Sequence, residues 1–334
     1  MKKTVARKEK RLWAGGFFLV LFFSLMTMAL NFSLTWAAEE AYPNKPINLV
    51  ISMTPGGVLD THAKIIGERL GEVLGQPVLR VHKPGGGGVL AASFVARSKP
   101  DGYTLFTGTS SNLVLPPILK KLDYELKDFV PLGIYCKGVV HLYVRTEAPW
   151  KTLEEFVAEA KKRQLKVSSY GKNSHAEFVI EAFSKQAGIK LAHVPYKSCS
   201  EAVTALLGEH VDADFCTSAI GQIAAGAVRI LAIADYERSK LFPEVKTFKE
   251  YGYTVALPMS YSLCVPRDTP KKIVDILANG MQEVFKRYGH NIEEELMRVD
   301  AIPAFYDSAK SIQEFNRDYE VTLKIAKELG VIEK

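Results

Sequence analysis

Residues 47–75 read INLVISMTPGGVLDTHAKIIGERLGEVLG, and this stretch decides the fold class. Its first five residues are a β-rich run, and residues 54–57 are a turn sequence, Thr-Pro-Gly-Gly. Apolar residues then recur at helical spacing until Gly75, a residue type that commonly ends a helix. A strand, a loop and a helix in this order form the repeating unit of an α/β fold.

The same order recurs along the rest of the chain. Capping-box spacings at Thr152, Ser174 and Ser198 predict helix starts, and a last amphipathic helix is expected at 308–329, before Gly330. With 334 residues, the chain is long enough for two α/β domains with largely parallel sheets. Further strands are expected at 78–81, 103–107, 166–169, 191–194, 211–215, 230–234 and 262–265.

The N-terminus resembles an export signal. Six basic residues precede an uncharged stretch at 12–38, and cleavage after Ala37 or Ala38 would fit. An uncleaved membrane anchor is the alternative, because the stretch is long enough to cross a hydrocarbon core of about 30 Å. Both readings place the rest of the chain outside the cytoplasm. Without residues 1–38, the net charge of +6 falls to about +1, which gives no reason to expect a nucleic-acid partner.

The four cysteines give no metal-site pattern. Cys136, Cys199, Cys216 and Cys264 are widely separated, without a C-x-x-C pair or histidines at zinc-ligand spacing. Buried small apolar side chains are the usual role for such residues. An oxidising compartment would also allow a disulfide such as Cys199 with Cys216, although connectivity does not follow from sequence.

Loops after the strands supply the candidate ligand site, since such loops line the crevice of open α/β sheets. In Pro55-Gly56-Gly57, the glycines let backbone N–H groups approach a ligand, and the following helix points its positive dipole end there. Asp60 would cap or orient the helix start. This arrangement suits a carboxylate.

Two more loops offer the same chemistry. The second contains Ser169, Tyr170, Gly171, Asn173, Ser174 and His175, and the third contains Thr109 and Ser110. Tyr196 also lies in a loop and is a further candidate. The alternative is structural: the glycines only make tight turns, and Ser174 only caps a helix. The functional reading requires that the loops converge.

Enzymatic signatures are weak. Gly86-x-Gly88-x-x-Ala91 nominally matches a dinucleotide fingerprint, but no acidic residue follows at the required distance in a strand, which favours close helix packing. His62 is expected to pack at a helix start, and His175 fits ligand contact and packing equally well. Without a G-x-S-x-G or H-E-x-x-H motif, neither catalysis nor a cofactor is expected.

Six segments in order resemble one receptor family. They are YPNKPI at 42–47, PGG at 55–57 with Asp60, GQPV at 75–78, PGGGG at 84–88, PDGYTL at 100–105 and VPYK at 194–197. In these segments the chain resembles the solute-binding proteins of tripartite tricarboxylate transporters, also called Bordetella uptake gene receptors. The resemblance extends over about residues 42–334.

The resemblance implies a type II periplasmic-binding-protein fold with two α/β domains, at 43–142 plus 262–334 and at 143–261. Two chain crossings would form the hinge, and the cleft between the domains would close on a small carboxylate, such as a di- or tricarboxylate or an aromatic acid. The implied partner is a membrane transporter with a large and a small subunit, and the receptor is expected to be a monomer. Sensing for a signalling partner and a nucleotide-using enzyme are the alternatives.

The chain departs from the family pattern at three places. Pro55 stands where Ala is common, and the loop at 170–175 is shorter than the usual Gly- and Ser-rich stretch. Cys216 and Thr217 follow Phe215 where the family commonly has an Asp, and both are therefore candidate ligand residues. The resemblance leaves the identity of the carboxylate open.

Overall fold

The structure is a computed structural model that describes residues 41–172, 174–217, 219–299 and 301–332. All the helices and strands below belong to one compact unit, Lys45–Lys334. The predicted export signal at 1–38 and the candidate residue Asn173 lie outside the described residues. In the part of the chain that is described, none of the helices combines the length and the apolar character needed to cross a membrane.

The first sheet has six strands in the order β11-β4-β10-β3-β1-β2. Strand β1 pairs in parallel with β2 and β3, whereas β10 is antiparallel to β3 and β4, and β11 is antiparallel to β4. The strands are β1 (Ile47–Ile51), β2 (Val78–His82), β3 (Thr104–Thr109), β4 (Phe129–Gly138), β10 (Met259–Pro266) and β11 (Ile302–Asp307).

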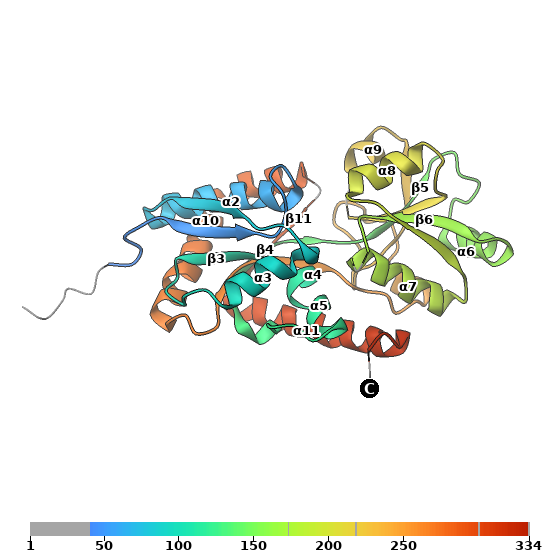
Figure 1. The fold of residues 1–334 in the computed structure, drawn as a ribbon. Coiled ribbons are helices and arrows are strands. Elements are labelled where there is room, and N and C mark those ends of the chain that lie inside the picture. Colours follow the sequence, from blue (N-terminus) through green and yellow to red (C-terminus); the bar gives the residue numbers. More distant parts are fainter. Residues whose placement is uncertain (1–40, 173, 218, 300, 333–334) are drawn as a thin grey trace, which may run out of the picture. The chain divides into compact units, whose positions relative to one another are not determined.

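Helices cover both faces of this sheet. In Figure 1, α2 and α10 lie on one face, and α3, α4 and α11 lie on the other. The elements are α2 (Val58–Leu74), η1 (Gly86–Gly88), α3 (Val89–Ala96), α4 (Ser110–Leu113), α5 (Leu115–Leu119), η2 (Leu126–Asp128), α10 (Lys271–Met297) and α11 (Ser308–Leu329). The glycines of the nominal dinucleotide fingerprint lie in η1 and at the start of α3, and a Cβ on Gly88 would come 2.8 Å from Cβ of Asn112. Close packing, as expected, therefore requires Gly88.

The second sheet has five strands in the order β7-β6-β8-β5-β9. Its strands are β5 (His141–Arg145), β6 (Leu165–Ser169), β7 (Leu191–Pro195), β8 (Ala213–Cys216) and β9 (Val228–Ile233). Its helices are α6 (Leu153–Lys162), α7 (His175–Ala187), α8 (Cys199–Leu207), α9 (Ile220–Ala224) and η3 (Phe248–Tyr251). Stacked and tilted aromatic rings, among them Phe183 and Phe248 with centroids 4.8 Å apart, fill the core on the α7 face.

Both sheets are mixed, so the expectation of largely parallel sheets is wrong. Parallel pairs occur where a strand, a helix and a strand follow one another, as in β1-α2-β2 and β6-α7-β7. The antiparallel pairs involve β4, β5 and β10, the strands that flank the passages between the sheets. Strands β5 and β10 each enter their sheet from the other sheet without a crossover helix, so no βαβ connection makes them parallel to their neighbours.

Helix α11 packs against both cores. Phe315, in its N-terminal half, belongs to the core cluster of the first sheet. Ile325 and Ala326, near its C-terminal end, are buried in the cluster that contains the α6 and α7 side chains of the second sheet. The predicted bounds of this helix, 308–329, are confirmed, with Asp307 as the N-cap and Gly330 in the left-handed conformation as the C-cap.

Candidate functional site

The first glycine loop leads directly into α2. Gly56 has φ of +81°, a conformation that favours glycine, and Gly57 is the N-cap of the helix. The Gly56 N–H donates to Asp60 Oδ2 at 2.8 Å, and the Gly57 N–H donates to the Thr54 carbonyl at 3.2 Å. Both amides therefore donate to acceptors within the loop, whereas the sequence predicted that they approach a ligand. Among the described residues, the amides of Val58 and Leu59 find no acceptor and remain for an anion.

Asp60 orders this loop. Its buried carboxylate accepts from Gly56 and also pairs with Arg80 Nη1 at 2.7 Å and His82 Nε2 at 2.8 Å. Burial alone would raise the pKa of Asp60, but the hydrogen bonds from Gly56, His82 and Arg80 outweigh burial and hold the pKa below its ordinary value. The expected orienting role is confirmed in geometry. A carboxylate so fully engaged is poorly placed to contact an acidic ligand directly.

Asp60→Asn should lower the free energy of unfolding by about 1–3 kcal/mol at pH 7, because a buried charged acceptor is lost opposite Arg80 and His82. The pKa of Asp60 is depressed in the folded protein, so its contribution is present above the ordinary value of 3.8 and is lost as the pH falls through the folded pKa. Urea unfolding at pH 7 and at pH 3 measures the difference. The role would be contradicted if Asp60→Asn were less stable than wild type by the same free energy at pH 3 as at pH 7. It would also be contradicted if the exposed control Glu244→Gln lost as much stability as Asp60→Asn.

The second glycine loop is also held together internally. Ser174 is the N-cap of α7; its Oγ accepts from the Glu177 N–H at 3.2 Å and donates to the Gly171 carbonyl at 2.7 Å. Ser169 Oγ lies 2.7 Å from His193 Nε2 and accepts from the Gly171 N–H. The structural reading of Ser174 as a cap is therefore confirmed, and both hydroxyls shape the loop.

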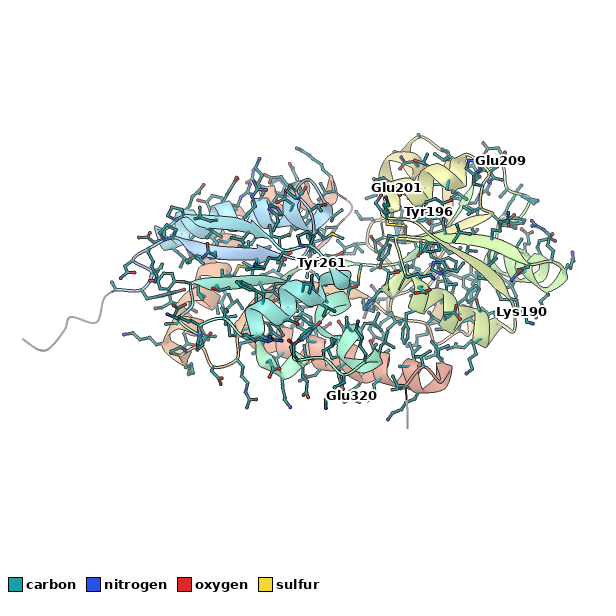
Figure 2. The ribbon with its side chains drawn as sticks, viewed as in Figure 1. Lys190, Tyr196, Glu201, Glu209, Tyr261 and Glu320 are labelled. Carbon is teal, nitrogen blue, oxygen red and sulfur yellow. A yellow bond between two sulfur atoms is a disulfide. The ribbon has the colours of Figure 1, made fainter. Side chains whose placement is uncertain are left out.

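His175, Tyr170 and Tyr196 are the other candidate residues in or next to this loop, and they differ in burial and in partners. His175 is only 1% exposed, its Nδ1 has no partner among the described residues, and burial lowers its pKa to about 4. Tyr170 Oη contacts Met259 Sδ of β10 at 3.7 Å, which links this loop to the first sheet. Tyr196, labelled in Figure 2, donates its N–H to the Ser169 carbonyl and is half-buried.

Three other candidates have structural roles. Thr109 forms a capping box with Asn112, and the Ser110 hydroxyl donates to Asp318 at 2.6 Å while accepting from the Ser260 N–H. Cys216 is fully buried and forms a disulfide with Cys199. The Thr109 and Ser110 side chains and the Cys216 sulfur are therefore bonded within the protein. Of the two cysteine readings, the disulfide applies to this pair, and Cys136 and Cys264 are free and buried.

A small pocket brings together elements of both sheets. Its lining residues come from the first turns of α2, the end of β4, β10, the segment after α10, and the segment after β8. They are Val58, His62, Gly138, Thr217, Tyr261, Val299 and Ala301. Thr217 is therefore the candidate residue that the structure brings next to the start of α2. Gly138 makes room here, because a Cβ would lie 2.9 Å from Cε2 of Tyr261.

His62 and Tyr261 were not expected at the site. His62 lies one helical turn after Val58, and residues four apart share one face of a helix, so both side chains line the pocket. Tyr261 precedes the strand expected at 262–265, in a segment where the sequence carries no distinctive signal. In the described part of the chain, no group of three His, Cys, Asp or Glu side chains is placed to hold a metal ion.

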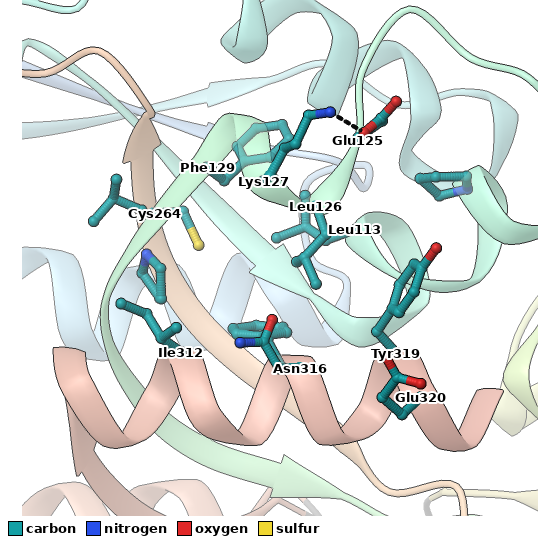
Figure 3. Close-up of a pocket in the computed structure, with 14 residues that line it drawn as sticks. Leu113, Glu125, Leu126, Lys127, Phe129, Cys264, Ile312, Asn316, Tyr319 and Glu320 are labelled. Atoms are coloured by element: carbon teal, nitrogen blue, oxygen red, sulfur yellow. Dashed lines mark ion pairs between the residues drawn. The ribbon is translucent and has the colours of Figure 1, made fainter. Parts of the chain in front are cut away.

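A larger pocket, of about 670 Å³, lies between α11 and the η2–β4 segment (Figure 3). Its walls include Leu126, Phe129 and Phe315, and neither glycine loop contributes to it. The rim lysine, Lys127, is paired with Glu125 at 2.7 Å. A carboxylate needs hydrogen-bond donors, so the start of α2 suits it better than these apolar walls.

Comparison with known proteins gives consistent results. Residues 63–331 match the family described as "Tripartite tricarboxylate transporter family receptor". A Cupriavidus necator protein, "UPF0065 protein in gbd 5'region", is 32% identical over 309 residues, which cover 89% of this chain and 90% of that protein.

Solved structures agree. A TctC solute-binding protein from Polaromonas is 26% identical, with a TM-score of 0.74 over 86% of this chain and 99% of that one. MatC from Rhodopseudomonas palustris with bound malate is also 26% identical, with a TM-score of 0.72 over 85% of this chain and 99% of that one.

Proposed function

Because this chain belongs to the tripartite tricarboxylate transporter receptors, we propose that it captures a small carboxylate and delivers it to a tripartite membrane transporter. Proteins of this kind are solute-binding receptors of the periplasmic-binding-protein fold and not enzymes, and so is this chain.

We infer the class of ligand from the first turn of α2. The bonded Gly56–Gly57 loop leaves the Val58 and Leu59 amides pointing out of the helix, where the dipole favours an anion. Val58 is 44% exposed and lines the pocket that also contains Thr217 from the other sheet. The similar MatC structure holds malate, a small carboxylate, which supports the same ligand class.

Capture would occur by domain closure. The proposed domains are residues 43–142 plus 262–334 and residues 143–261, which would move about the passages from β4 to β5 and from β9 to β10. The second loop, with Gly171, Ser174, His175 and Tyr196, would then approach the ligand from the second domain. Pro55, Gly56 and Gly57 would shape the opposite side, and the receptor would act as a monomer.

Export through the signal at 1–38 would place this receptor in the periplasm. The Cys199–Cys216 disulfide supports such a location, since disulfides form and persist in oxidising compartments. Mass spectrometry of the protein secreted from a bacterial host would locate the cleavage point after Ala37 or Ala38, or reveal an uncleaved anchor.

A thermal-shift screen of the purified receptor tests the ligand class. One class of carboxylate, among dicarboxylates, tricarboxylates and aromatic acids, should raise the melting temperature, because a ligand at about 100 times its Kd adds about 2.7 kcal/mol of stability. Amino acids and nucleotides are the comparison set. Stabilisation by a nucleotide alone, or by no carboxylate after unfolding and refolding to remove bound ligand, would contradict the proposal.

A further inference from the structure

His62 is a buried histidine with an unused hydrogen-bonding atom. It is 1% exposed, and its Nε2 has no partner among the described residues. The other ring nitrogen, Nδ1, lies 3.7 Å from Sγ of Cys136, and the ring packs edge-on against Tyr135 and Tyr261. A buried polar atom without a partner costs stability, so its presence in a pocket calls for a function.

The pocket beside His62 has room for about one oxygen atom. Its volume is about 10 Å³, close to the space of a single water-sized probe. Its seven lining residues include no Lys, Arg, Asp or Glu. Burial lowers the pKa of His62 to about 4, so the ring is uncharged at neutral pH. An unpaired carboxylate buried here would lose its hydration without compensation, so the pocket favours an uncharged polar group.

The pocket lies beside the proposed carboxylate position. Val58 and His62 are four residues apart on α2, a rise of about 6 Å, and helical side chains lean back toward the N-terminus. Both residues line the pocket, and Val58 also carries one of the unbonded first-turn amides. A carboxylate at the helix start thus places the neighbouring atoms of the same molecule within reach of the His62 ring.

We propose that His62 Nε2 binds a hydroxyl group of the ligand, so that the receptor selects hydroxy acids over the same acids without the hydroxyl. A hydroxyl both donates and accepts, and it therefore pairs with Nε2 in either neutral tautomer of the ring. This inference rests on the proposed capture of a carboxylate at α2. It assigns His62 to ligand selectivity, with Tyr261 and Gly138 positioning the walls of the pocket.

Titration calorimetry with two matched pairs, malate with succinate and 3-hydroxybenzoate with benzoate, tests the assignment. The wild-type receptor should bind one hydroxy acid at least about tenfold more tightly than its partner, since a site with an unpaired polar group rejects the analogue that leaves it unpaired. His62→Leu should reduce that ratio to about one through weaker binding of the hydroxy acid. His141→Leu is the matched control: His141 is another buried histidine with an unpartnered Nε2, but it does not line the pocket.

A second variant covers the case in which His62→Leu does not fold. Gly138→Ala places a Cβ 2.9 Å from Tyr261 Cε2 and should press that ring into the pocket, which would also reduce the ratio. Equal affinities of the wild-type receptor for an acid with and without the hydroxyl would overturn the inference. An affinity ratio that is unchanged in either folded variant would overturn it as well, and this is the result expected if the pocket holds only an ordered water. If none of the four acids nor any other carboxylate binds, the proposed function itself fails.

Discussion

Gly57→Val should weaken carboxylate binding on the order of 100-fold while the receptor stays folded. Gly57 has φ of −74° and ψ of 168°, which a valine adopts readily, so the backbone does not oppose the change. A Cβ at this position meets the Thr54 carbonyl at 3.3 Å and Cβ of Met53 at 3.7 Å, and the branched side chain would cover the amides of the first turn. Calorimetry with the carboxylate that the thermal-shift screen identifies measures the loss.

Two controls separate blocking from unfolding. Gly57→Ala adds a single methyl group and should give a smaller loss than Gly57→Val. Gly289→Ala, in α10, adds a Cβ that meets no atom within 4 Å and should leave binding unchanged. Equal affinity of the wild type and Gly57→Val would remove the start of α2 from the site, whatever the effect on stability.

Asp214→Asn should change how stability depends on pH. Asp214 lies on β8, is fully buried, and accepts from Ser168 Oγ at 2.7 Å, while its Oδ2 has no partner among the described residues. Burial raises the pKa of Asp214 to about 7, although hydrogen bonds from Ser168 and the Phe215 amide oppose that rise. The folded protein therefore keeps this proton over a pH range in which the unfolded chain has lost it.

The sign follows from proton binding. Between the ordinary pKa of 3.8 and the folded pKa of about 7, the folded state binds more protons than the unfolded state, so raising the pH lowers stability. Between pH 4 and pH 8, the free energy of unfolding of the wild type should fall by about 4 kcal/mol relative to that of Asp214→Asn, because the asparagine does not titrate. Urea unfolding at several pH values tests this. Parallel curves for wild type and Asp214→Asn, or an equal shift in the exposed control Asp268→Asn, would contradict it.

Local signals made parts of the fold predictable. The helix at 308–329 has apolar residues at helical spacing and Gly330 directly after it, and α11 has the same bounds. The capping residues Thr152, Ser174 and Ser198 all accept from the backbone N–H three residues on. Strand direction was not predictable, because the pairing of β4, β5 and β10 depends on the path of the chain between sheets and not on their own residues.

The candidate site was predictable in its loops but not in its side chains. Glycines that require special backbone conformations, such as Gly56, mark the loops in the sequence itself. The partner of a hydroxyl depends on distant residues: Ser110 meets Asp318 across 208 positions. His62 was missed for the same reason, since the rings that pack against it, Tyr135 and Tyr261, come from the distant strands β4 and β10. The Cys199–Cys216 disulfide, by contrast, was one of the pairings that the sequence allowed.

The attachment of α11 to both cores limits how this receptor can move. Two lobes joined by two strands alone could twist about each other as well as close. Helix α11 adds a third anchor, with Phe315 in one core and Ile325 and Ala326 in the other. In the domain closure proposed above, this attachment would favour a rotation about an axis near α11, and the glycine loops, far from that axis, would move furthest. Binding energy gained at those loops would then produce one defined change in the surface that the proposed transporter contacts.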